Sequence, residues 1–502
     1  MNLSAHLDRR HVWHPFTQMQ DWMKQEPRML VSGRGAVLTD ARGHDYLDAN
    51  SSIWTNLHGH RHPRINAAIR RQLSRVAHVS ALGSANEPAS HLAARLTRAA
   101  NPARIPPPRL EKVFFSDDGS TAIEVALKLA YEYTRRTRGP KSRPRFLAMQ
   151  GGYHGDTIGA VSLGHIDLFH QAYQRLLFPS DAVMAPYCYR CPYNRAQPER
   201  ADAREYRRCH WECVRNVETR LAAARRKGNP YAGFAFEPVM QGAAGMIPQP
   251  SGWLGKVTSL ARDHGALLIA DEVMTGFGRL HPTPKSWAKK SASRTPGRIA
   301  SGLFASHDEG VQPDFLCLAK GLTGGYLPMA ATLTTPAVFD AFLGDYGEFK
   351  TFFHGHSFTA NPLGAAASVA SLDLLESSGS RYDRYRLENG LREELRGLWD
   401  LPAVGDIRQS GTVAGIELVR HWPTRTPYEL SEQAGIRVCE AMARRGVLTR
   451  PIGNVIVLMP PYCTTPRQVR SMVAALGEAI EETLGDSKPL ATPTRGRDPT
   501  RR

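Results

Sequence analysis

ALLIAD (266–271) and FLCLAK (315–320) are the two stretches that decide the fold of this chain. Each is a short apolar run that ends on one charged residue, Asp271 or Lys320, and a glycine-containing turn follows. Such runs predict buried strands, and ligands of an open parallel sheet bind outside the carboxyl ends of its strands. The carboxylate and the amine are therefore predicted to face one site. Pyridoxal phosphate chemistry needs this pair, whereas a buried structural ion pair is the alternative interpretation.

Alternating strands and helices surround these stretches. Strands are predicted at 112–115, 145–149, 232–236, 266–270 and 315–319, and helices at about 120–134, 251–264, 362–376 and 430–446. Such alternation predicts a large α/β domain at 76–345, in which helices cover both faces of a mostly parallel sheet. The flanking segments 1–75 and 346–485 are predicted to join as one smaller α+β domain.

Charge and composition exclude several classes of protein. The net charge is +17, but 281–302 and 486–502 supply +8 of it and are predicted to be a surface insertion and a disordered basic tail. No basic stripe with interleaved aromatic residues appears, so we expect no nucleic-acid partner. No apolar run reaches the ~20 residues of a membrane helix, and the N-terminus lacks a secretory h-region. Seven cysteines do not make a disulfide scaffold, so a cytoplasmic protein without a membrane partner is expected.

Glycine-bearing turns predict where a flat, phosphorylated ligand would bind. In SDDGSTA, Gly119 lets the backbone approach an anion at a helix N-terminus, and Ser120 adds a hydroxyl. In GGYHGDT, Tyr153 can stack on an aromatic ring. The alternatives are a plain helix cap, and a core Tyr153 beside a surface His154. The run TFFHGHSFTANP adds three candidate donors for a phosphate, Gly355, His356 and Ser357.

Four cysteines form a pattern in a predicted insertion at 188–213. CYRC and CHWEC, with His210 in the second motif, space four thiols as in a small zinc site: Cys188, Cys191, Cys209 and Cys213. C-x2-C followed by C-x3-C is only moderately specific, and a loop insertion with incidental thiols is the preferred interpretation. No metal is therefore assigned to the chain.

Nine motifs together resemble the fold-type I, class III aminotransferases, and within them the adenosylmethionine-8-amino-7-oxononanoate aminotransferases (7,8-diaminononanoate synthases) of biotin synthesis. They are WHPFTQM (13–19), SSIWTNLHGHRHP (51–63), SDDGSTAIEVALKLA (116–130), GGYHGDTIGAVSLG (151–164), EPVMQGAAGM (237–246), ADEVMTGFGR (270–279), LAKGLTGGYLPMAATLTT (318–335), FFHGHSFTANPL (352–363) and LTRPIGNVIVLMPP (448–461). The lysine–aspartate pair marks the class, whereas WHPFTQM, HGHSFTANP and the TRP at 449–451 are more specific to the biotin branch.

The resemblance implies a pyridoxal 5'-phosphate site. Lys320 would form the Schiff base and shuttle a proton, Asp271 would hold the pyridinium nitrogen, and Tyr153 would flank the ring and the substrate. Four residues would bind the phosphate: Gly119, Ser120, His356 and Ser357. The last two lie where the second subunit of such enzymes completes the phosphate site, so an obligate homodimer with its active site at the interface is implied.

The resemblance also implies a substrate site. Arg450 would pair with the carboxylate of the keto substrate, and its planar fork suits a carboxylate better than a lysine does. Trp54 and Gly355 would line the substrate pocket, Asp156 is a candidate partner for the amino group of the donor, and Arg279 is a second carboxylate-site candidate. The expected reaction is transamination of 8-amino-7-oxononanoate to 7,8-diaminononanoate, with ping-pong kinetics.

Two substrate-site positions depart from the branch that uses S-adenosyl-L-methionine as amino donor. Phe16 stands where that branch usually has a tyrosine, and Ile53 stands where it has the first of two tryptophans. A missing phenol removes a hydrogen bond typically worth ~0.5–1.5 kcal/mol. S-adenosyl-L-methionine is the expected donor and L-lysine is the alternative. Another class III ω-aminotransferase, or an inactive scaffold that binds the cofactor, are further alternatives.

Overall fold

The computed structural model describes residues 3–282 and 302–485. The predicted basic tail at 486–502, and all of the predicted insertion at 281–302 except residues 281, 282 and 302, lie outside these ranges. None of the helices within them has the length and apolar character needed to cross a bilayer.

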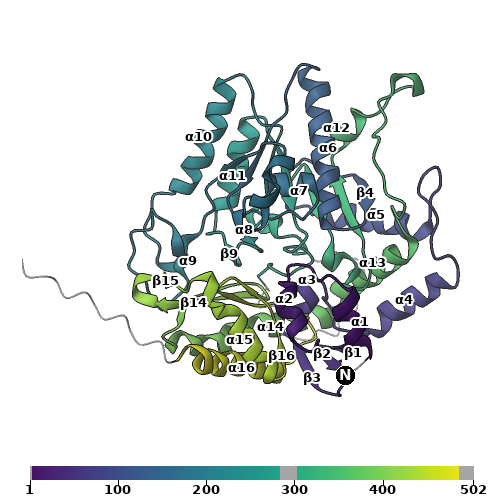
Figure 1. Cartoon of the computed structure of the whole chain (residues 1–502). Coiled ribbons are helices and arrows are strands. Elements are labelled where there is room, and N and C mark those ends of the chain that lie inside the picture. Colours follow the sequence, from purple (N-terminus) through teal and green to yellow (C-terminus); the bar gives the residue numbers. More distant parts are fainter. Residues whose placement is uncertain (1–2, 283–301, 486–502) are drawn as a thin grey trace, which may run out of the picture.

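A seven-stranded sheet forms the centre of the molecule (Figure 1). Its strands, in spatial order, are β4 (Lys112–Ser116), β12 (Ala330–Thr334), β11 (Phe315–Leu318), β10 (Leu267–Asp271), β7 (Gly233–Phe236), β5 (Phe146–Met149) and β6 (Asp181–Val183). β11, β10, β7, β5 and β6 are parallel, and β12 is antiparallel to both of its neighbours. The prediction of a mostly parallel sheet is therefore confirmed, although β12 and β6 were not predicted.

Side chains that alternate along each strand pack against helices on the two faces of the sheet. In β10, Leu268 and Ala270 belong to one buried cluster and Ile269 to another. The first cluster includes residues of α5 (Glu87–Ala100), α10 (Glu212–Arg226), α11 (Trp253–Asp263) and α13 (Pro362–Leu375). The second includes residues of α6 (Gly119–Arg138) and α7 (Ile158–Leu163). Strands covered on both faces have to be apolar throughout, which explains the continuous apolar runs.

Capping groups set the ends of the predicted helices. Asp118 and Thr121 form a reciprocal capping box, so α6 starts at Gly119 and runs to Arg138, beyond the predicted 134. The helix predicted over 430–446 is shorter, because α15 spans Ala434–Arg444 after a 3-10 turn and a left-handed Gln433.

The two ends of the chain meet in a second sheet. β1 (Leu30–Arg34), β2 (Val37–Asp40) and β3 (Asp45–Asp48) pair in order, and β16 (Val447–Leu448) joins β3 in parallel. In Figure 1 the purple N-terminal strands accordingly lie beside the yellow-green C-terminal elements. A further sheet consists of β13 (Val404–Ser410), β14 (Val413–His421), β18 (Val455–Leu458) and β17 (Pro451–Ile452), with β15 (Thr426–Pro427) on β14.

The remaining elements are α1 (Leu3–His11), α2 (Met19–Lys24), α3 (Ser51–Trp54), α4 (Pro63–Leu73), α8 (Asp167–His170), α9 (Ala203–Tyr206), α12 (Pro336–Asp340), α14 (Ser378–Glu394), α16 (Pro466–Leu484), β8 (Met240–Gln241) and β9 (Ile247–Pro248).

Candidate active site

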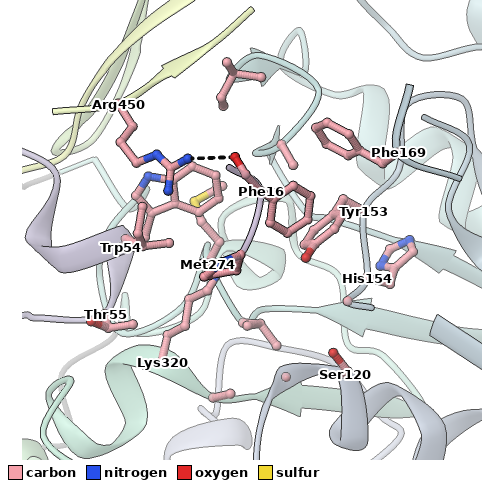
Figure 2. Close-up of a pocket in the computed structure, with 18 of the residues that line it drawn as sticks. Phe16, Trp54, Thr55, Ser120, Tyr153, His154, Phe169, Met274, Lys320 and Arg450 are labelled. Carbon is pink, nitrogen blue, oxygen red and sulfur yellow. Dashed lines mark hydrogen bonds between the residues drawn. The ribbon is translucent and has the colours of Figure 1, made fainter. Parts of the chain in front are cut away.

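A cavity of about 1170 Å³ opens at the carboxyl ends of the parallel strands (Figure 2). Nine of the predicted site residues line it: Phe16, Ile53, Trp54, Gly119, Ser120, Tyr153, Asp271, Lys320 and Arg450. Five do not line it in the single chain: Asp156, Arg279, Gly355, His356 and Ser357. Its wall also contains residues to which the sequence analysis gave no role in the site, among them His154, Glu237 and Phe169.

Three neighbouring strands deliver charged residues to this cavity. Asp271 ends β10, Lys320 follows β11, and Glu237 comes directly after β7. AGFAFE at 232–237 has the same form as ALLIAD and FLCLAK, so the pattern that identified Asp271 and Lys320 was also available for Glu237. Parallel neighbours end at one edge, which explains why the three groups converge.

Lys320 occupies a strained, half-buried position. Its φ is +43°, a left-handed value that a non-glycine residue adopts at a cost of roughly 1–3 kcal/mol. Its Nζ lies 4.7 Å from the centroid of the Trp54 ring (Figure 2). Burial lowers the pKa of this amine, against the opposing attraction of Asp271 and Glu237. A lowered pKa increases the unprotonated fraction, which is the nucleophilic form.

His154 holds Asp271 in place. Its Nδ1 lies 2.8 Å from Asp271 Oδ2, and the Val273 N–H donates to Asp271 Oδ1 at 3.1 Å. Burial disfavours the imidazolium, but the hydrogen bond and the charge of Asp271 outweigh burial, so the pKa of His154 is raised. The histidine is 3% exposed, so the alternative of a surface residue is wrong. Nothing in the sequence marked it except its place beside Tyr153.

Two glycines allow close packing around the turn at 117–121, where the phosphate is expected to bind. Gly119 lets this turn approach the residues after β10, and Gly155 lets the segment 151–157 approach Ser120. A Cβ on Gly119 would lie 2.7 Å from Val273 Cγ1, and a Cβ on Gly155 would collide with Ser120 Oγ. The hydroxyl of Tyr153 donates to Asp156 at 2.7 Å. Asp156 therefore holds Tyr153 from outside the cavity.

A left-handed turn presents Ile53 and Trp54 to the cavity. Residues 51–54 all have φ between +48° and +68°, which is costly for consecutive non-glycine residues. Asp48 accepts hydrogen bonds from the Ser52 N–H and hydroxyl at 3.1 Å each, and it lies 2.9 Å from His60 Nε2. These bonds compensate part of the strain.

The two candidate arginines have different environments. Arg450 lines the cavity and donates to the Phe16 carbonyl at 3.5 Å, leaving most of its donors available (Figure 2). Arg279 is 1% exposed and donates to the backbone carbonyls of Pro460 and Asn56 at 2.8 and 2.9 Å. It does not line the cavity, so the expectation that Arg279 binds a carboxylate is wrong.

The segment 351–361 lies beside the turn at 117–121 but does not line the cavity of the same chain. His356 Nδ1 lies 2.7 Å from Asp117 Oδ2, and Asp117 lines the cavity. Gly355 and Ser357 are exposed.

The cysteine insertion packs against the C-terminal sheet. Arg190 contacts Glu417 of β14 at 2.6 Å, and Arg204 donates to the Gln409 carbonyl of β13 at 2.7 Å. All four insertion cysteines are free thiols. Within residues 3–282 and 302–485, no group of three or more His, Cys, Asp or Glu side chains is arranged to hold a metal ion.

The cavity residues fit pyridoxal phosphate. A half-buried amine, a carboxylate fixed by a histidine, an aromatic ring and a capped helix N-terminus that glycine leaves open all face one space. They match the aldehyde, the pyridine nitrogen, the flat ring and the phosphate of that cofactor.

Comparison with known proteins gives the same result. The class-III aminotransferase family matches residues 19–480. A relative from Geobacter sulfurreducens, named adenosylmethionine-8-amino-7-oxononanoate aminotransferase, is 44% identical over 95% of this chain and 97% of its own length. The relative of the same name from Nitratidesulfovibrio vulgaris is 47% identical over 94% of this chain and 81% of its own length.

Solved structures agree. The Methanocaldococcus jannaschii protein of that name has a TM-score of 0.83 at 37% identity, covering 96% of this chain and 99% of that one. An amine transaminase from an uncultivated Pseudomonas species, in a PLP-bound form, has a TM-score of 0.81 at 31% identity, covering 94% and 99%. This chain therefore belongs to the class-III aminotransferases and is a pyridoxal phosphate-dependent enzyme.

Proposed function

We propose that this enzyme transfers an amino group to 8-amino-7-oxononanoate, giving 7,8-diaminononanoate for biotin synthesis, with S-adenosyl-L-methionine as the donor. The observation that carries the proposal is Arg450, whose guanidinium lines the same cavity as Lys320 and suits the terminal carboxylate of this keto acid. Curated relatives that are 39% to 47% identical to this chain carry the name of this activity, which supports the assignment.

Each cavity residue has a chemical task in this proposal. When bound, pyridoxal phosphate supplies an aldehyde that condenses with amines and a ring that accepts electrons. Lys320 Nζ holds the proton that moves at the substrate carbon bearing the amino group. Asp271, fixed by His154, would lie beside the ring nitrogen, and Tyr153 would flank the ring. Gly119 and Ser120 would bind the phosphate at the start of α6.

L-Lysine is the second candidate donor, and two wall residues favour it. Phe16 offers no phenol hydroxyl, and its ring packs edge-on against Phe169 with centroids 5.3 Å apart. Ile53 presents an aliphatic surface where a second indole would contact a sulfonium cation.

We also propose a cytoplasmic homodimer, in which His356 and Ser357 complete the phosphate site of the partner and Gly355 lines its substrate pocket. Several large apolar side chains on and near this segment are strongly exposed, as expected of a surface that a second copy covers: Tyr346, Phe349, Phe353 and Phe358. A mass of two chains by light scattering is expected. The β3–β16 pairing supports our proposed division into a large domain, 76–345, and a small one from 1–75 and 346–485.

An assay of 7,8-diaminononanoate formation with both donors in parallel tests the proposed reaction. We expect product with 8-amino-7-oxononanoate and S-adenosyl-L-methionine. Product with L-lysine alone would replace the donor but keep the reaction, and absence of product with either donor would contradict the proposed function.

A further inference from the structure

Glu237 is a buried carboxylate on the cavity wall that none of the assignments above uses. We propose that it binds the ammonium group adjacent to the reacting ketone of the substrate, the 8-amino group of 8-amino-7-oxononanoate. This inference rests on the proposed function, because only a substrate with a vicinal amine gives the carboxylate a cationic partner.

The position of Glu237 in the sheet brings it next to the reacting atoms. It follows β7, which lies between β5 and β10, so Tyr153 and Asp271 are its neighbours at the strand ends. Both Glu237 and Asp271 act electrostatically on the Lys320 amine. If the ketone of the substrate reacts near Lys320 Nζ, the adjacent amino group lies one carbon away. It would then also feel the negative charges of Glu237 and Asp271.

The hydrogen bonds of Glu237 leave it able to accept more. Oε1 accepts from the Tyr153 N–H at 3.2 Å, and Oε2 accepts from the Gly242 N–H at 2.7 Å. A carboxylate has about four acceptor positions, so two neutral backbone donors do not saturate it. In the part of the chain that the structure describes, no lysine, arginine or histidine forms an ion pair with Glu237. A buried carboxylate without a cationic partner is costly, and a bound ammonium would compensate that cost.

An indole and a thioether of the cavity wall lie close to the Glu237 carboxylate, on the side of Gly242. A Cβ added to Gly242 would meet Met274 Cε at 3.0 Å, Trp54 Cζ3 at 3.4 Å and Glu237 Oε2 at 3.5 Å. The close packing at Gly242 therefore brings an indole and a thioether of the cavity wall next to this carboxylate. The Lys320 Nζ lies 4.7 Å from the centroid of the Trp54 ring, and an indole face favours a cationic neighbour.

Burial raises the pKa of Glu237 to about 7, and the charge of His154 opposes that rise. A bound cation would favour the ionised form. Asp156, the other candidate partner for an amino group, already accepts a hydrogen bond from the Tyr153 hydroxyl and does not line the cavity.

Two ketones that differ only in the vicinal amine test the proposal: 8-amino-7-oxononanoate and 7-oxononanoate. The holoenzyme, first converted to its aminated form by the donor, is mixed with each ketone, and kcat/KM and the dissociation constant are measured. For Glu237→Gln we expect a loss of about 10- to 100-fold with the amino ketone and less than about threefold with 7-oxononanoate. Glu272→Gln is the matched control, because Glu272 is also buried and accepts two backbone N–H groups but does not line the cavity.

If Glu237→Gln lowers kcat/KM equally for both ketones, so that the preference for the amino ketone is unchanged, the role of Glu237 is overturned but the proposed function is not. A wild-type enzyme that turns over neither ketone would overturn the proposed function and this inference with it. If Glu237→Gln does not fold, Gly242→Ala answers the same question, because its methyl group would lie 3.5 Å from Glu237 Oε2 and crowd the surroundings of the carboxylate. We expect it to reduce turnover of the amino ketone more than that of 7-oxononanoate, and equal reductions would contradict the proposal.

Discussion

At the scale of single residues, the cavity joins charges that would be unfavourable if buried one at a time. Lys320 has two carboxylates within electrostatic reach, Asp271 and Glu237, and His154 forms an ion pair with the first of them. Asp271 and His154 thereby gain opposite charges, which reduces the desolvation cost of this pair. The arrangement keeps an amine and a carboxylate ready for the cofactor in one cavity.

His154 is expected to act through Asp271. His154→Leu removes the donor to Asp271 Oδ2, a hydrogen bond to a charged group worth roughly 1.5–3 kcal/mol. We expect the affinity for pyridoxal phosphate to fall about 10- to 100-fold. His154→Asn keeps an N–H donor and should recover most of it. Equal cofactor dissociation constants for the two variants, measured by absorbance titration, would contradict this role.

Arg450 is expected to select the substrate by its carboxylate. Arg450→Lys keeps the charge but loses the planar fork, so KM for 8-amino-7-oxononanoate should rise about tenfold or more. The amino donor half-reaction should change less. Arg437→Lys, an exposed arginine of α15 that does not line the cavity, is the control. An unchanged KM in Arg450→Lys would show that the carboxylate of the substrate does not bind to Arg450.

At the scale of elements, the left-handed turn at 51–54 is the device that presents Ile53 and Trp54. Nothing in the composition SSIW indicates φ > 0, since serine, isoleucine and tryptophan all disfavour it. The turn is imposed by Asp48 and by the Ser51 hydroxyl, which donates to the Met459 carbonyl at 2.6 Å. This contact joins residues more than 400 positions apart, so local pattern cannot predict it.

The left-handed backbone at Ile53 predicts that glycine is more stable than alanine at this position, the reverse of the order in an ordinary helix. In an ordinary helix glycine is less stable than alanine by roughly 0.5–1 kcal/mol. At Ile53, with φ +64°, Ile53→Gly should be more stable than Ile53→Ala by about 1 kcal/mol. Ile436, similarly exposed at the same cavity but in α15, should show the ordinary order. Urea unfolding of the four variants measures this, and alanine as the more stable residue at both sites would refute the strain.

Elements that are formed by local interactions can be predicted from the sequence, whereas elements that depend on contacts with distant residues cannot. The predicted strands and helices were found because their apolar runs and caps are local signals. β12 was not predicted, because AATLT carries no strong pattern and pairs with distant residues of β4 and β11. In the cavity, Lys320, Asp271 and Arg450 were found from motifs, whereas burial of Arg279 and His154 depends on tertiary contacts that no local pattern shows.

At the scale of the whole molecule, buried carboxyl groups link stability to pH. Burial raises the pKa of Glu272 to about 7, from an ordinary 4.5. The folded chain then binds more protons than the unfolded chain between these values. The stabilising contribution of this group is therefore complete below about pH 4.5 and is lost as pH rises through about 7.

Glu272→Gln isolates this contribution, because a glutamine does not titrate. Relative to wild type, the variant should gain stability as pH rises from about 5 to about 8, by at most about 3 kcal/mol. Urea unfolding of the apoprotein at several pH values measures the difference. A difference that does not vary with pH would show that Glu272 is ionised at the same pH in both states.

The most direct test of the whole account is the identity of the lysine that carries the cofactor. The holoenzyme is reduced with borohydride, digested, and its peptides are mapped by mass spectrometry. We expect the mass of the reduced cofactor on Lys320 and on no other lysine, with loss of the label in Lys320→Ala. Label on a different lysine, or none on a fully loaded enzyme, would contradict the assignment of this cavity as the active site.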